Sequence, residues 1–482
     1  MTEFVIALCM LIGGYAVYGA LMERVIGINP KQPMPAYTKR DDVDYMPMSS
    51  WRAFLIQFLN IAGLGPIFGA IMGVMYGPSA FLWIVLGTIF AGGVHDFLSG
   101  VISIRMNGAS LPEIVGSELG NGVKKAMLVF ATLLLLLVTA VFIITPAGLL
   151  ATMTPEWMNT TFWIIAIFAY YLLATLLPID KLIGRLYPLF GLSLLFMALA
   201  LLGVIFFGNV NLPLDFNGGL GTRFGGDSSL AHPVWPMMFV SIACGAISGF
   251  HATQSPMIAR CLTNEKLARP VFYGAMVAEG VVALIWAAAT IAFTGGYENL
   301  DSYMSAHGNN AGALVHDISF GWLGTIGGIL AVLGVVAAPI TTGDTALRSA
   351  RLMVADFAKL NQRKIWGRLA ITIPLCITVG AILMIDFSVL WRYFAWCNQT
   401  LATFTLWAVT VYLARHGKVY IVALLPAMLM TAVCLSYVLF APRPEGLGLE
   451  HTLSTSIATG VALILCALFM RHRKQLKPHT ND

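Results

Sequence analysis

The sequence predicts an all-α polytopic membrane protein with about thirteen transmembrane helices. Of its 482 residues, 58% are hydrophobic and only 11% are charged, whereas soluble globular proteins average about 25% charged residues. Segments of about 20 mostly apolar residues, the length that crosses a bilayer, recur along the whole chain. These two observations exclude a soluble globular fold and imply a chain embedded in lipid.

The loop charges orient the predicted spans. With the N-terminus outside, all 28 Lys and Arg residues fall in inner loops or the inner tail, except Arg223, Arg392 and Arg443. Because inner loops carry the excess of Lys and Arg, this distribution supports the count and places the C-terminus in the cytoplasm. The spans are residues 3–23, 52–75, 79–103, 124–147, 158–178, 186–207, 234–255, 270–294, 322–345, 368–386, 389–413, 418–440 and 453–470.

Two function classes, nucleic-acid binding and enzymatic catalysis, are disfavoured. The net charge of +5 follows from the Lys and Arg residues of the inner loops, so we expect no nucleic-acid partner.

The first span has no basic region before it, and we interpret it as a membrane helix and not as a cleaved signal. The seven cysteines show no metal-ligand spacing, and no phosphate loop or GxSxG motif occurs. We therefore expect free thiols, no enzymatic activity, no metal and no cofactor other than a coupling ion.

The first unusual element lies at residues 60–69, inside the span 52–75. Gly63, Gly65 and Pro66 disfavour a continuous helix there, and Pro66 suits the first turn of a second half-helix. The N–H groups that open this half-helix would form an anion site at mid-depth, with Asn60 within reach. The alternative is a kinked packing helix, which is common in membrane proteins.

A second break is predicted at residues 244–251, inside the span 234–255. Ser248 is a possible N-cap, Gly249 follows it, and His251 falls in the first turn after the break. An imidazole there could meet an anion or carry a proton. A buried histidine whose hydrogen bonds are satisfied within the protein is the alternative.

The two breaks define a predicted domain organisation. They lie five helices apart, on helices that run in opposite directions, so residues 52–207 and 234–413 form two five-helix units related by inversion. Residues 1–24 and 414–482 are additional helices with the cytoplasmic tail. Residues 25–51 form a cytoplasmic linker, and 208–233 an extracellular loop. Paired interrupted spans in two halves point to the binding site of a secondary transporter. The outer segments 208–233 and 295–321 are either lids or plain connectors.

Ionisable and polar side chains inside the spans are the remaining candidates. For the adjacent pair His95 and Asp96 we favour a structural polar contact, with a role in coupling as the alternative. Glu279 is interpreted either as a polar contact that holds neighbouring helices together or as a proton relay. Residues 341–345 gather Thr341, Thr342, Asp344 and Thr345, whose oxygens suit a cation or, at Asp344, a proton, beside Pro339 and Gly343, which loosen the helix. The alternative for Asp344 is an ion pair with Arg348 at i,i+4 spacing.

Deep in the span 389–413, the amide of Asn398 could contact substrate or glue helices together. The distinctive motifs of the chain extend over roughly residues 25–410. They are residues 29–45, 90–97, 243–251, 273–280, 341–346 and 398–399. As a set they resemble the carbon starvation protein A (CstA) family of membrane transporters, in a compact form. Arg392, after Trp391, stands where the family has Trp-Pro.

The resemblance implies an architecture similar to the leucine-transporter (LeuT) fold, a bacterial inner-membrane location, and uptake of peptides or pyruvate. We expect a secondary active transporter that imports a small carboxylate-bearing nutrient by alternating access, coupled to H⁺. The alternatives are Na⁺-coupled transport of amino acids or peptides, and a membrane sensor that moves no solute. We expect the substrate site to consist of Asn60, Gly63, Gly65, Pro66, Ser248, Gly249, His251 and Asn398. We expect the coupling site to consist of Thr341, Thr342, Asp344, Thr345 and Glu279.

Overall fold

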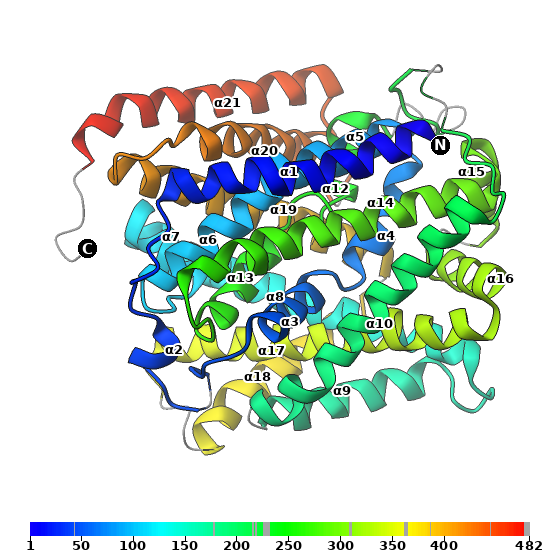
Figure 1. The fold of residues 1–482 in the computed structure, drawn as a ribbon, viewed down its shortest axis with the longest axis horizontal. Coiled ribbons are helices and arrows are strands. Elements are labelled where there is room, and N and C mark those ends of the chain that lie inside the picture. Colours follow the sequence, from blue (N-terminus) through cyan, green and yellow to red (C-terminus); the bar gives the residue numbers. More distant parts are fainter. Residues whose placement is uncertain are drawn as a thin grey trace.

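A computed structural model describes residues 1–42, 44–176, 179–214, 216, 219–224, 232–307, 311–360, 365–385, 387–443 and 445–476. Every regular element among these residues is a helix (Figure 1), so the predicted all-α class is confirmed. The first half comprises α1 (Thr2–Ile26), α2 (Pro35–Thr38), α3 (Ser50–Ile61), α4 (Gly65–Val74), α5 (Ser79–Gly87), the π-helical η1 (Thr88–Gly92), α6 (Gly93–Arg105), α7 (Leu111–Leu119), α8 (Asn121–Met153), α9 (Thr160–Leu176) and α10 (Ile179–Phe207).

The second half begins with a π-helical turn. Its elements are η2 (Val234–Met238), α12 (Phe239–Ser241), α13 (Gly249–Ala259), η3 (Glu265–Leu267), η4 (Arg269–Tyr273), α14 (Gly274–Thr294), α15 (Tyr297–Ala306), α16 (Ala311–Ala331), η5 (Val332–Val336), α17 (Ala337–Ala358), α18 (Ile365–Ile382), α19 (Phe387–Arg415), α20 (Ile421–Phe440), α21 (His451–His472) and η6 (Arg473–Gln475).

Helices of membrane-spanning length recur along the described residues. Eight helical stretches are long and apolar enough to cross a bilayer, and α3 with α4 forms one further span bent by 45°. The chain is therefore a multi-pass membrane protein. The count of about thirteen spans, the inverted repeat and the domain bounds stay predictions. Residues 477–482 of the tail and 225–231 of the outer loop lie outside the described residues.

The predicted break in the first core span is confirmed. Helix α3 ends at Ile61 and α4 begins at Gly65, with Pro66 in its first turn. The bend of 45° follows from local chemistry, because proline lacks an N–H and fits a first turn, where that N–H would have no partner in the helix.

The second predicted break is confirmed as well. Helix α12 ends at Ser241, and α13 begins only at Gly249. Gly245 has φ +93°, a left-handed conformation that glycine adopts at no steric cost. The Cα of Pro66 would lie 3.5 Å from a Cβ on Gly245, so the two breaks pack directly on one another.

The helix around residues 341–345 differs from its prediction in its bounds. The apolar pattern predicts a span over 322–345, loosened by Pro339 and Gly343. In the structure α17 begins at Ala337 and continues as a helix to Ala358. Pro339 does not interrupt the helix: α16, the π-helical turn η5 and α17 follow one another without a gap, and the π-helical turn lies just before the proline.

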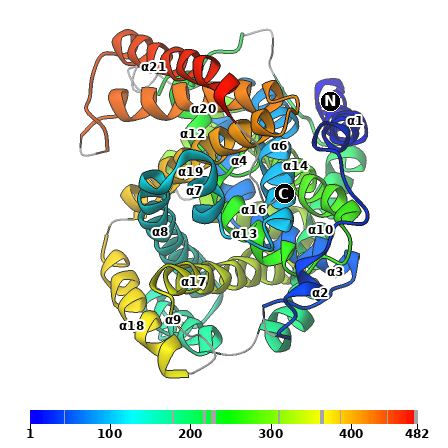
Figure 2. The ribbon, with the colours of Figure 1, turned by 90° about the vertical axis from the view of Figure 1, so that its left-hand side faces the viewer.

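The broken helices lie inside a shell of longer ones. In Figure 2, α20 and α21 lie at the top edge, α9 and α18 at the bottom, and α13 near the centre. Only 22% of the apolar window of α1 and of α21 is buried in the protein, against 72% for α8. Helices α1 and α21 are therefore peripheral, whereas the breaks are shielded from lipid, as irregular backbone at membrane depth must be.

Candidate functional site at the two helix breaks

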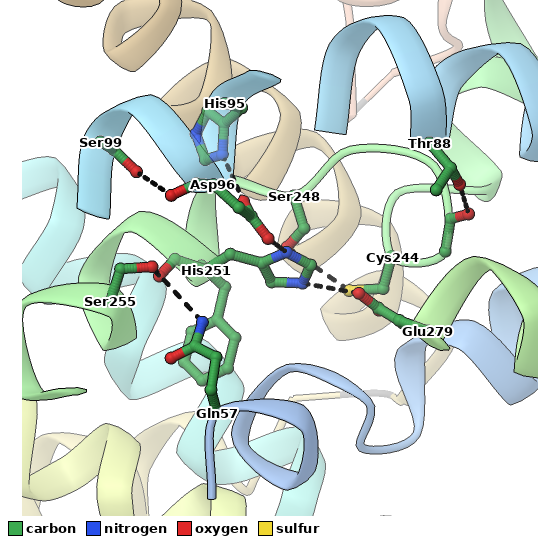
Figure 3. A network of polar contacts seen from close by, with 12 residues as sticks. Gln57, Thr88, His95, Asp96, Ser99, Cys244, Ser248, His251, Ser255 and Glu279 are labelled. Atoms are coloured by element: carbon green, nitrogen blue, oxygen red, sulfur yellow. Dashed lines mark hydrogen bonds and ion pairs between the residues drawn. The ribbon is translucent and has the colours of Figure 1, made fainter. Parts of the chain in front are cut away.

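A chain of ionisable side chains joins α6, α13 and α14 beside the second break (Figure 3). Asp96 lies between two histidines: its Oδ1 is 2.7 Å from His95 Nδ1, and its Oδ2 is 2.8 Å from His251 Nδ1. The other ring nitrogen of His251, Nε2, is 3.4 Å from Glu279 Oε2. All four side chains are fully buried. Ionisable groups at this depth mark functional sites by default.

Local backbone chemistry brings these side chains together. The break places His251 in the first turn of α13, while His95 and Asp96 lie in the first turn of α6, which continues directly from the π-helical turn η1. The Thr88 hydroxyl of η1 donates a hydrogen bond to the Gly245 carbonyl in the break, at 2.8 Å. The irregular turn and the break thus support one another, as π-bulges at functional sites often do.

Asn398 of α19 caps the start of α13. Its Oδ1 accepts hydrogen bonds from the Phe250 N–H at 2.7 Å and from the Ser248 hydroxyl at 3.0 Å. Ser248 occupies the predicted N-cap position, but its side chain does not cap the helix. Gly249 leaves no room for a side chain, because a Cβ there would overlap the α19 backbone. The Phe250 N–H, next to the predicted substrate residues Ser248 and Gly249, is therefore used within the protein.

The first break packs against α17. The Thr345 hydroxyl donates to the Thr342 carbonyl at 2.8 Å and lies 3.4 Å from Asn60 Oδ1. The Thr342 hydroxyl lies 3.1 Å from the Leu59 carbonyl. A Cβ on Gly63 would lie 3.5 Å from the Thr342 hydroxyl. Asn60 Nδ2 is buried and makes no hydrogen bond to the described residues. This donor is therefore available to an incoming acceptor.

The predicted coupling cluster is held within α17. Thr341 donates to the Ala338 carbonyl at 2.7 Å, and the single Thr342 hydroxyl proton is shared between that carbonyl at 3.0 Å and the Leu59 carbonyl. Asp344 is fully buried. Arg348 donates to the Ala174 carbonyl at 2.7 Å. The structure thus places residues 341–345 at the first break, next to Asn60.

The tertiary structure brings residues of the predicted substrate site into contact with residues of the predicted coupling site. His251, expected near substrate, lies against Glu279, expected in the coupling set. Asn60, also expected near substrate, contacts Thr345 of the coupling set. Gly65 has a packing role, because a Cβ there would overlap the Cys244 side chain. Sequence reasoning favours a structural contact for Asp96, yet it is the residue that links both histidines.

Arg392 lies away from this chain of contacts. Its Nε is 2.6 Å from Glu445 Oε1, in the segment after α20. The neighbouring Trp391 packs on Phe68 of α4, with ring centroids 5.9 Å apart. Arg392 therefore ties α19 to the α20–α21 connection.

A basic vestibule opens on the side that the loop charges predict to be cytoplasmic. It is a cavity of about 1130 Å³ with Arg260, Arg348 and Arg351 among its lining residues, all at most 8% exposed. Among the described residues that line it, cationic side chains outnumber acidic ones two to one: Lys39, Lys124, Arg260, Arg348, Arg351 and Arg368 against Asp41, Asp44 and Glu113. Sequence reasoning assigns these arginines to loops and misses the cavity.

A narrow pocket leads from the vestibule toward the first break. It measures about 20 Å³ and shares Asp44, Arg260 and Leu352 with the vestibule. Its lining also includes Asn60. This pocket has room for about one water molecule, so it separates the vestibule from the buried Asn60 amide.

Solved structures resemble this chain in fold. A manganese transporter of Eremococcus coleocola is 14% identical, with a TM-score of 0.51 and coverage of 87% of this chain and 93% of that one. A Na⁺-coupled sialic acid symporter in a substrate-bound outward-open state is also 14% identical, with a TM-score of 0.51 and coverage of 95% and 97%. At this identity the likeness shows the fold alone, a helical transporter fold.

Relatives in sequence are closer. An uncharacterised membrane protein of Haemophilus influenzae is 43% identical over 64% of this chain and 94% of its own length. The peptide transporter CstA of Bacillus subtilis is 29% identical, over 60% of this chain and 58% of its own length. The pyruvate/proton symporter BtsT of Escherichia coli is 27% identical, over 56% and 46%.

The chain spans about half the length of the curated transporters it matches. The model of the family described as "Carbon starvation protein CstA" matches residues 1–161 and 152–327. These matches cover more than half of the chain and include both helix breaks, His95, Asp96, His251 and Glu279. The chain therefore belongs to the carbon starvation protein CstA family.

Proposed function

We propose that this protein is a secondary active transporter that imports a small carboxylate-bearing nutrient by alternating access. The observation that carries the proposal is the basic vestibule of about 1130 Å³, which narrows toward Asn60 at the first helix break. Pyruvate and peptides, named for two relatives, both carry a carboxylate. A vestibule with excess positive charge raises the local concentration of such anions inside it, next to the pocket at Asn60.

The substrate site that we propose lies between the two breaks. Asn60 Nδ2 offers a buried donor with no hydrogen bond to the described residues, and it would bind a carboxylate oxygen. The opening N–H groups of α4 add the positive end of a helix dipole. Because the vestibule lies on the proposed inner side and stops at a pocket of about 20 Å³ before Asn60, we assign the conformation to an inward-facing state with a closed substrate site.

Coupling to H⁺ is assigned first to Asp344. It is fully buried and directly precedes Thr345, whose hydroxyl lies 3.4 Å from Asn60 Oδ1. Protonation of a carboxyl one residue from this contact would change how α17 holds the first break. Asp344→Asn is expected to abolish accumulation against a gradient while exchange continues. Unchanged accumulation would move coupling to His251 and Glu279.

Counterflow in liposomes tests the substrate class. Labelled pyruvate and labelled dipeptides are compared, and exchange of either supports transport. Arg351→Gln is expected to raise KM for the carboxylate about 10–20-fold, because a unit charge acting over ~10 Å would contribute ~1.7 kcal/mol at an effective dielectric constant of ~20. Arg471→Gln, an exposed position on α21, is the control with unchanged KM. No exchange of either compound, or equal KM values in both variants, would contradict the proposal.

The orientation is also proposed, with the N-terminus outside the bacterial inner membrane. Single cysteines at Asn299 on α15 and Lys359 after α17 test it, since both positions are exposed. We expect an impermeant thiol reagent added outside to label the first and not the second. The reverse pattern would overturn the orientation.

A further inference from the structure

Three buried side chains beside the second break have the chemistry of a metal site. Cys244 Sγ, His251 Nε2 and a Glu279 carboxylate oxygen all lie within 4.8 Å of one another (Figure 3). They come from the break, from α13 and from α14. We propose that Cys244, His251 and Glu279 bind one transition-metal cation, with Zn²⁺ the best match. This goes beyond the proposed transport function and does not depend on the substrate.

The polar atoms that face this point have few other partners. Apart from the 3.4 Å contact between His251 Nε2 and Glu279 Oε2, these two groups have no hydrogen-bond partner among the described residues at this point, and both side chains are fully buried. Burying such groups without partners costs several kcal/mol, and more when one is charged. A cation bound by all three groups removes this cost.

Asp96 already orients His251 as metal sites require. A carboxylate only accepts hydrogen bonds, so the 2.8 Å contact places the proton of His251 on Nδ1. The lone pair of Nε2 then points away from Asp96, toward Glu279. Histidine ligands of metals typically donate their other N–H to a carboxylate in this way. His95 in turn holds the second oxygen of Asp96 at 2.7 Å.

The ligand types and spacing select the metal. A thiolate with an imidazole favours Zn²⁺ and related ions, whereas Mg²⁺ and Ca²⁺ take oxygen ligands. Tetrahedral Zn²⁺ with bonds of ~2.0–2.3 Å separates its ligand atoms by ~3.3–3.8 Å. His251 Nε2 and Glu279 Oε2 are 3.4 Å apart, which fits, and Cys244 Sγ lies within 4.8 Å of both, so a shift of at most about 1–1.5 Å would complete the site. Three protein ligands leave a fourth position for water or another ligand.

The two anionic ligands match the charge of a divalent cation, while Asp96 keeps its own charge between the two histidines. Binding releases the Cys244 thiol proton, and the resulting thiolate with the Glu279 carboxylate neutralises a divalent cation. The Asn398 amide donates to Cys244 Sγ at 3.4 Å and would stabilise the thiolate. A metal here fastens the second break to α14, so it would hold the break in one conformation.

Metal binding by the purified full-length protein in detergent tests the proposal. After treatment with a chelator, Zn²⁺ is added and measured by elemental analysis and titration calorimetry. We expect one Zn²⁺ per chain for the wild type and for Cys376→Ser, a control that removes a buried thiol on α18. Cys244→Ser and Glu279→Gln should bind at least about tenfold more weakly. Asp96→Asn, which removes the carboxylate that orients His251, should weaken binding about 10–100-fold.

Spectroscopy of the wild type keeps the test independent of how well the variants fold. The Co²⁺-loaded protein should show a thiolate-to-metal charge-transfer band, and X-ray absorption of the Zn²⁺ form should show one sulfur at ~2.3 Å with nitrogen or oxygen at ~2.0–2.1 Å. A wild type that binds no stoichiometric Zn²⁺ would overturn the proposal, leaving a proton shared by His251 and Glu279. A Zn²⁺ site without sulfur, or a charge-transfer band that persists in Cys244→Ser, would also overturn it.

Discussion

Adding one methyl group at Gly65 should destabilise the contact between the two helix breaks. Gly65 opens α4, and a Cβ built there would overlap both the Cβ and the Sγ of Cys244, with the Cys244 Cα at 3.7 Å. Neither partner can move away easily, because Gly245 in turn packs on Pro66. Gly65→Ala therefore forces the two breaks apart.

The size of the effect follows from overpacking. Extra methyl groups in packed interiors cost about 1–3 kcal/mol, and we expect the upper end because the overlap involves a Cβ and not only a flexible side-chain end. For domains of about 150–250 residues, 1 kcal/mol shifts the melting temperature by about 2–4 °C, and by less in longer chains. A decrease of a few degrees is therefore expected.

Thermal unfolding of the purified protein, with a chelator present, measures this shift. Gly460→Ala on α21 is the control, because nothing lies within 4 Å of its Cβ and alanine favours a helix by up to about 1 kcal/mol. Cys244→Gly removes the overlapping atoms, so Gly65→Ala should cost much less in that background. If Gly65→Ala melts like Gly460→Ala, or if Cys244→Gly gives no rescue, the packing argument fails.

Three further predictions concern other contacts of the site and its surroundings. Asn398→Ala leaves the Phe250 N–H without its acceptor and should destabilise the protein by about 1–3 kcal/mol; an unchanged melting temperature would show that another group caps α13. In a double-mutant cycle, the partly exposed Arg392–Glu445 pair should couple by no more than about 1 kcal/mol, and stronger coupling would contradict a peripheral role. Burial raises the pKa of the Cys261 thiol to about 11, so maleimide labelling of Cys261 should be slow at pH 7 and rise with pH up to about 11; fast labelling at pH 7 would refute its burial.

The class of the protein and the places where its helices break follow from the order of residues alone. Apolar segments of spanning length predict membrane helices, because the bilayer imposes that length on any chain. Gly63, Gly65 and Pro66 predict the first break, and the glycines at 245 and 249 accompany the second. These are local properties of the backbone, so they can be inferred from neighbouring residues.

Which polar side chains meet could not be predicted in this way and depends on how the helices pack. Asp96 and His251 are 155 residues apart, and Thr345 and Asn60 are 285 apart, so no spacing in the sequence connects them. The same holds for the Asn398 cap on α13, 148 residues from Phe250, and for the arginines that gather around the vestibule. Hydropathy predicts that a helix is buried but not which face meets which neighbour. That choice depends on how side chains from distant helices interlock at contact distance, which is a property of the packed fold as a whole.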